Sequence, residues 1–191
     1  MKKKIVLLMS SFCLCVGLYS QVSIKAGNTL VYKLNEYDGP VEQTITLETI
    51  QPDIKISWNK KNKYDDKGTL IIKSSAKESA TNIVFNFPIN SKNDELSDVL
   101  LGFIVSKKTF SELKANKKTK IRIDCQLKSE ELVFKDIQPM NITIAGKKQA
   151  VNCVNASWGT FGDEMWILDN AEMPIIIKVS ALSKFELIEI K

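Results

Sequence analysis

The chain has 191 residues and a formal net charge of +5, and it contains no histidine. The lack of histidine excludes the usual general base, the commonest zinc ligand and every nucleophile that a histidine activates. Lysine supplies all the positive side-chain charge except that of Arg122, whereas proteins that read nucleic acids rely on arginine, so we expect no nucleic-acid partner.

The first twenty residues have the layout of a secretory signal peptide. Three lysines precede an apolar stretch from Ile5 to Leu18, and small and polar residues follow it. The stretch is shorter than the roughly 20 apolar residues that span a bilayer, and cleavage is expected near Ser20–Gln21. Lipidation at Cys13 or Cys15 is the competing interpretation. We expect export to the periplasm or the extracellular space, with no transmembrane segment in the mature chain.

Residues 21–191 alternate apolar and polar side chains in short segments, which is typical of strands in a sheet with one buried face. Turn-forming residues separate the segments. The pattern predicts one antiparallel, mainly β domain of about a dozen short strands. The expected strands cover residues 29–34, 44–50, 53–59, 69–75, 82–87, 119–127, 131–137, 140–145, 150–156, 163–169, 174–180 and 184–190.

One segment departs from the strand pattern. A dense apolar run extends from Val99 to Val105, and Phe110 and Leu113 then follow at helical spacing. Ser106 is a suitable N-cap for a short helix over residues 107–116. We therefore expect one short helix in the domain.

The residues offer little support for catalysis. Ser111 and Lys114 fit a Ser-x-x-Lys pair, but the companion motifs of that chemistry are missing. Adjacent acids such as Asp65 and Asp66 would point to opposite faces of a strand and could not share a substrate. We expect no catalytic residue, no metal site and no cofactor. A hydrolase that uses carboxylates from separate strands ranks last among the functions considered.

The sequence WILDN, residues 166–170, combines a tryptophan and an acid at the end of a predicted strand. Asp169 and Asn170 have short polar side chains that bond the local backbone in turns. Pro174 then opens the next strand, where its missing N–H costs least. We interpret Asp169 as a turn former and keep Trp166 as the functional candidate.

Large aromatic side chains are frequent in the predicted strands. They form an ordinary β core, or some of them line an apolar cavity in a curved, incompletely closed sheet. The candidates for the wall of such a cavity are Trp58, Phe85, Phe87, Phe103, Trp158, Phe161 and Trp166.

Two cysteines remain beyond the leader, Cys125 and Cys153. Each lies on the apolar face of a predicted strand. In an oxidising compartment an even pair is a candidate for a disulfide. The alternative is two separate buried thiols, because free cysteine behaves as a small hydrophobic residue.

Several segments occur in an order that resembles a set of uncharacterised exported β-proteins, mostly of Bacteroidota, assigned to domain-of-unknown-function families. The segments are GNTLVYKL, VSKKTFSELKANKK, ITIAGKKQAVNCV and the closing DEMWILDNAEMPIIIKVSALSKFELIEIK. At the C-terminus Trp166, Leu168, Asp169 and Pro174 match the family's ending, whereas Asn170 stands where a second acid is common.

Such domains look similar to periplasmic lipoprotein carriers, whose bent antiparallel sheet takes up acyl chains on its concave face. The resemblance therefore implies a strongly curved sheet, a half-barrel or open barrel, in which Val99–Leu113 plugs the concavity. It implies no catalytic residue.

Three functions follow from these observations. The leading hypothesis is an exported, non-enzymatic β domain of the periplasm that binds a lipid, another apolar ligand or a lipidated partner. The alternative is a structural or interaction protein of the cell envelope with a filled core and no small-molecule ligand. The third is the carboxylate-dependent hydrolase.

Overall fold

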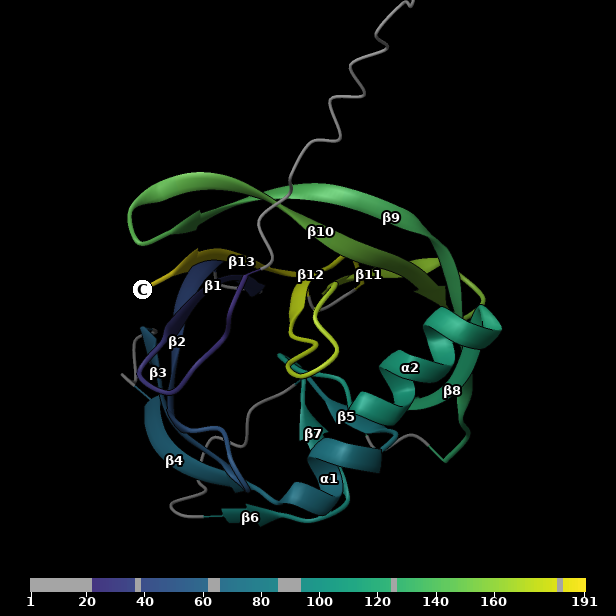
Figure 1. Ribbon diagram of the computed structural model, residues 1–191, viewed down its shortest axis with the longest axis horizontal. Helices are drawn as coiled ribbons and strands as arrows, with labels where there is room; N and C mark the ends of the chain where they lie inside the picture. The colour runs from purple at the N-terminus through teal and green to yellow at the C-terminus, as the bar shows by residue number, and fades with distance from the viewer. Residues whose placement is uncertain (1–21, 37–38, 62–65, 86–93, 125–126, 182–183) are drawn as a thin grey trace, which may run out of the picture.

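The computed structural model describes residues 22–36, 39–61, 66–85, 94–124, 127–181 and 184–191. These residues form a mainly β structure, which confirms the predicted fold class (Figure 1). The strands are β1 (Thr29–Glu36), β2 (Gly39–Thr49), β3 (Ile54–Lys61), β4 (Asp66–Ile72), β5 (Asn82–Val84), β6 (Asp94–Leu96), β7 (Val99–Leu101), β8 (Lys118–Ile123), β9 (Glu130–Ile144), β10 (Lys147–Trp158), β11 (Asp163–Leu168), β12 (Ile176–Val179) and β13 (Phe185–Ile190). The helices are α1 (Ser74–Ser79) and α2 (Lys107–Asn116).

The strands form one large, strongly curved sheet in the order β6-β4-β3-β2-β1-β13-β12-β11-β10-β9-β8-β5-β7. Most neighbours are antiparallel, and short parallel pairings join β4 to β6 and β5 to both β7 and β8. The end of β9 also pairs in parallel with the end of β13, at Thr143–Ile144 and Glu189–Ile190. This last pairing closes a ring of five strands, β9 to β13, within the larger sheet.

The structure divides the chain differently from the prediction in several places. The short strands β6 and β7 occur where no strand was predicted. The predicted strand over residues 69–75 ends at Ile72, and a second helix, α1, begins at Ser74. The backbone N–H of Ser74 donates to Asp53 Oδ1 at 2.8 Å, a contact between distant residues that starts the helix. The two strands predicted over 131–137 and 140–145 are one strand, β9, in which Pro139 is exposed and pairs with Asn152 of β10.

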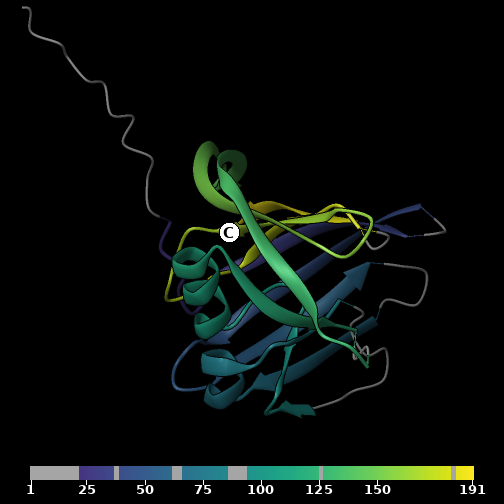
Figure 2. The same ribbon diagram turned by 90° about the vertical axis from the view of Figure 1, so that its right-hand side faces the viewer.

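The predicted helix is confirmed as α2. The Ser106 side chain caps its N-terminus, and Lys117 ends it in the left-handed conformation with φ of 63°. Phe110 and Leu113, the two apolar residues at helical spacing, are both buried. Helices α1 and α2 lie side by side in both views (Figures 1 and 2).

The core consists of two clusters of buried apolar side chains. The first core cluster includes Leu30, Tyr32, Ile45, Leu47, Ile56, Trp58, Leu70, Leu100, Leu101, Phe103, Ile104, Val151, Cys153, Leu168, Ile175, Leu187 and Ile190. The second core cluster includes Ile83, Val105, Phe110, Leu113, Ile121, Leu132, Val154, Ala156, Trp158, Met165, Ile167, Ile176 and Val179. The apolar run that begins at Val99 contributes to both clusters, so it fills the space inside the curve of the sheet.

The N-cap of α2 gives a test of this packing. Ser106 is fully buried, and its Oγ accepts a hydrogen bond from the backbone N–H of Thr109 at 3.1 Å. The substitution Ser106→Ala removes this bond and is expected to lower the free energy of unfolding by about 1–2 kcal/mol, as measured by denaturant titration. The matched control Ser111→Ala lies on the exposed side of the same helix and should change it by less than about 0.5 kcal/mol. Equal losses in the two variants would contradict the capping role.

Candidate functional site

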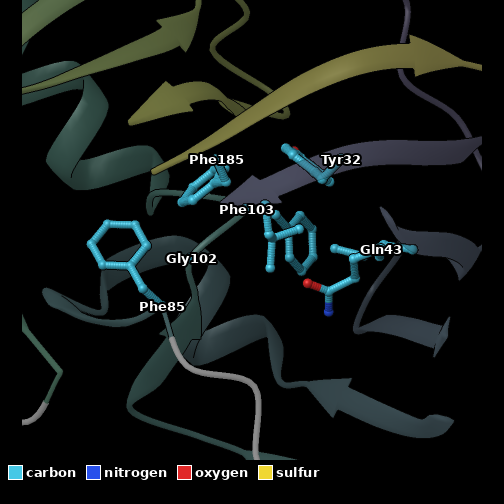
Figure 3. Close-up of a pocket in the computed structure, with 8 residues that line it drawn as sticks. Tyr32, Gln43, Phe85, Gly102, Phe103 and Phe185 are labelled. Carbon is cyan, nitrogen blue, oxygen red and sulfur yellow. The ribbon is translucent and has the colours of Figure 1, made fainter. Parts of the chain in front are cut away.

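A half-open apolar pocket lies inside the curve of the sheet, where the two core clusters meet (Figure 3). Its walls come from β1, β2, the start of β13 and the residues that follow β5 and β7. The lining residues are Tyr32, Leu34, Gln43, Ile45, Phe85, Gly102, Phe103 and Phe185. Its volume is about 20 Å³, while a water molecule needs about 10–15 Å³. This gap between the described side chains therefore has room for little more than one water molecule.

Strand register brings the walls of the pocket together. Tyr32 of β1 pairs with Gln43 of β2, and Leu34 of β1 pairs with Phe185 of β13. Phe85 and Gly102 meet because β5 and β7 are parallel neighbours. A Cβ atom at Gly102 would lie 2.3 Å from Cδ1 of Phe85 and 2.9 Å from its Cα. Only glycine permits this approach, which sets the position of the Phe85 ring.

Four of the eight residues that line the pocket are aromatic. The Phe185 ring lies 5.6 Å from the Tyr32 ring, edge to face, and 5.6 Å from the Phe85 ring. The far side of Phe85 faces Trp158, with 6.4 Å between ring centroids and an interplanar angle of 25°. Phe185 packs against both core clusters. The pocket is thus the gap that remains where two apolar cores join.

Two polar side chains reach into this apolar surrounding. The Tyr32 hydroxyl donates to the carbonyl oxygen of Ile176 at 2.9 Å, and burial raises its pKa above the ordinary value, so it stays neutral. Gln43 is only 3% exposed, and its Nε2 has no hydrogen-bond partner among the described residues. In Figure 3 the amide oxygen of Gln43 lies on the side of Phe103, and its nitrogen points away from the labelled rings. A residue on the wall of the pocket thus carries a buried donor group that has no partner among the described residues.

The structure brings two of the predicted wall residues, Phe85 and Phe103, into this pocket. Trp158 is buried in the second core cluster and reaches the pocket only through its stacking on Phe85. Trp58 is buried in the first core cluster and borders a separate hollow between β2, β3 and β4, where most of the other lining residues are polar. Phe87 lies outside the described residues.

Phe161 and Trp166 do not line the pocket. The Phe161 side chain is 96% exposed in the loop between β10 and β11, so it is neither core nor wall. Trp166 is partly buried against the first core cluster. Its Nε1 donates to Oε1 of Gln138 at 3.2 Å, and the Lys178 ammonium lies 5.6 Å from its ring centroid. Tyr32, Gln43 and Phe185 were missed, because only strand pairing across the whole chain places them together.

The turn after β11 is held by the Asn170 side chain, as predicted, but not by the Asp169 side chain that was interpreted as a turn former. Asn170 Oδ1 accepts hydrogen bonds from the backbone N–H groups of Glu172, at 3.0 Å, and Met173, at 3.1 Å. Asp169 instead pairs with Lys114 of α2, with 2.6 Å between Oδ1 and Nζ. Lys114, the lysine of the Ser-x-x-Lys pair, is thus held by Asp169 of the turn, while Ser111 is exposed. These contacts tie α2 to the β11–β12 connection.

Cys153 is a buried free thiol, and Cys125 lies outside the described residues, so the structure does not show the disulfide considered from the sequence. Burial, together with the negative charge of Asp169, raises the pKa of the Cys153 thiol to about 12. The thiolate is the reactive form of cysteine. Near neutral pH Cys153 therefore acts as a core residue and not as a nucleophile.

Two further findings concern the described residues. They include no group of three or more aspartate, glutamate or cysteine side chains placed to hold a metal ion. Neither of the two helices that they form is long and apolar enough to pass through a bilayer.

Comparisons of the chain with protein-family models, curated proteins and solved structures find no match. The family resemblance seen in the sequence stays a prediction.

Proposed function

We propose that the chain is an exported, non-enzymatic β domain that binds a small apolar group carrying a hydrogen-bond acceptor. The observation that supports this is the aromatic pocket with the unpaired, buried Nε2 of Gln43 on its wall. A buried donor without a partner costs about 1–3 kcal/mol. A ligand oxygen that accepts from Gln43 would remove this cost while its apolar part contacts Phe85, Phe103 and Phe185.

The volume of the pocket limits what it binds. Pockets that enclose drug-sized ligands measure about 300–1,000 Å³, whereas this one measures about 20 Å³. A complete acyl chain does not fit in this pocket. The ligand is the apolar end of a lipid, of a lipidated partner or of another small molecule. Entry of a group larger than water requires the rings of Phe85 or Phe185 to move aside.

The small volume of this pocket also favours a second function, a structural or interaction protein of the cell envelope. Here the pocket is a packing defect between the two core clusters, and the domain acts through its surface. The two functions differ in a measurable way, because only the first requires the pocket to admit an apolar molecule.

Export gives the first prediction. Expressed with its leader in a Gram-negative host, the protein should be recovered outside the cytoplasm with an intact mass that begins at Gln21, because the first twenty residues follow the signal-peptide pattern. Mass spectrometry distinguishes this from lipidation at Cys13 or Cys15, which adds acyl mass and moves the protein into detergent. A full-length mass in the cytoplasm would contradict export.

A matched pair of probes gives the second prediction. Methyl benzoate and propylbenzene have similar shapes, but only the ester can accept a hydrogen bond from Gln43. Both should shift the ¹H–¹⁵N amide signals of the pocket residues. In Gln43→Met the affinity for methyl benzoate should fall by about fivefold, the worth of one net hydrogen bond, while propylbenzene binds as before.

Stability provides the control for the same variant. Because Met has no unpaired donor, Gln43→Met should raise the free energy of unfolding by about 1 kcal/mol. Gln149→Met, on half-buried Gln149 of β10 outside the pocket, should leave both affinities unchanged. If neither probe shifts the pocket signals at millimolar concentration, the pocket is not a binding site. The second function, a structural or interaction protein, is then favoured.

A further inference from the structure

Lys77 of α1 is a buried lysine that forms no direct ion pair with an acid of the described residues, although its charge acts on Glu172. The residue is 5% exposed, and lysines are almost never buried unless they are paired. Its Nζ donates one hydrogen bond, to the carbonyl oxygen of Ile50 at 2.8 Å. An ammonium group has three N–H donors, so the remaining two have no partner among the described residues.

Two acids, Glu78 beside Lys77 in the sequence and Glu172 before β12, are both bound by another lysine. Nζ of Lys107, at the start of α2, lies 2.8 Å from Oε2 of Glu172 and 3.2 Å from Oε1 of Glu78. The hydrogen bond from Lys107 and its charge lower the pKa of Glu172, with a smaller contribution from the charge of Lys77, so Glu172 stays ionised and held to Lys107. This arrangement leaves the ammonium of Lys77 available for a different anion.

Lys77 borders a hollow of about 380 Å³ that shares no residue with the aromatic pocket. One side is apolar, formed by the buried side chains of Val22, Ile24 and Met173. Asn170 holds this side in place, because its Nδ2 donates to the carbonyl oxygen of Val22 at 3.0 Å and its Oδ1 accepts from the turn. The hollow thus combines a buried cation with an apolar wall.

We propose that this hollow is a second binding site, for a small monocarboxylate with a short apolar chain. The carboxylate accepts hydrogen bonds from Lys77, and the chain lies against Val22, Ile24 and Met173. A single negative charge is preferred, because the carboxylate of Glu172 also borders the hollow and repels a dianion. The site is independent of the aromatic pocket and of the function proposed for that pocket.

The test uses the purified protein and three probes. Hexanoate and hexan-1-ol have the same six-carbon length, and the third probe is inorganic phosphate. Binding is followed by the ¹H–¹⁵N amide signals of residues 22–24, 50, 51 and 77. Hexanoate should shift these signals at concentrations at least tenfold lower than hexanol or phosphate, because the carboxylate forms charged hydrogen bonds with Lys77. In Lys77→Met hexanoate should lose this advantage over hexanol, while Lys120→Met, on an exposed residue of β8, keeps it.

The comparison of the three probes on the wild-type protein tests the proposal even if Lys77→Met does not fold. If hexanoate and hexanol shift the signals equally, or if hexanoate shifts none of them, the carboxylate site is rejected. If phosphate binds more tightly than hexanoate, the preference for a monocarboxylate is rejected. If Lys77→Met folds and retains the hexanoate preference, Lys77 is not the anion-binding group.

Discussion

Three neighbouring strands, β10, β11 and β12, bury side chains on both faces, and the rest of the structure follows from the need to cover both. The cross-strand pair Cys153 and Leu168 points into the first core cluster, and the next pair, Val154 and Ile167, points into the second. Buried apolar surface is worth about 25 cal/mol per Å², so neither face can be left to solvent. The sheet curls to cover one face, and α2 with β8 covers the other.

The same constraint explains where the aromatic pocket lies. Phe185 is the first residue of β13 and packs against both core clusters. Two cores that meet along one strand cannot both be close-packed at the junction without matching side-chain shapes. The rings of Phe85, Phe103 and Phe185 leave a small gap there, and Gln43 presents its amide to it. The pocket is a consequence of joining two cores within one curved sheet.

Patterns within short segments of the sequence predicted the elements that depend mainly on neighbouring residues in the chain. Alternation identified most strands, helical spacing identified α2, and the Asn170 turn was expected from its side chain. Helix α1 was missed because it is only six residues long and starts at a contact with Asp53, about twenty residues earlier. The pocket was identified in part, through Phe85 and Phe103. Leu34 pairs with Phe185 across most of the chain, and no local pattern contains that pairing.

Size and hydrophobicity are also a poor guide to which aromatic residues face a cavity. Phe161 is fully exposed while Trp58 is buried, although both were expected at a cavity wall. The polar exceptions are more informative, because burying a polar group without a partner is unfavourable and requires a reason. Gln43 and Lys77 are two such groups, each on the wall of a different cavity and each short of partners among the described residues. The free-energy cost of an unpaired buried donor is removed when a ligand accepts a hydrogen bond from it. These two positions, and not the number of aromatic residues, are therefore the places to look for a ligand.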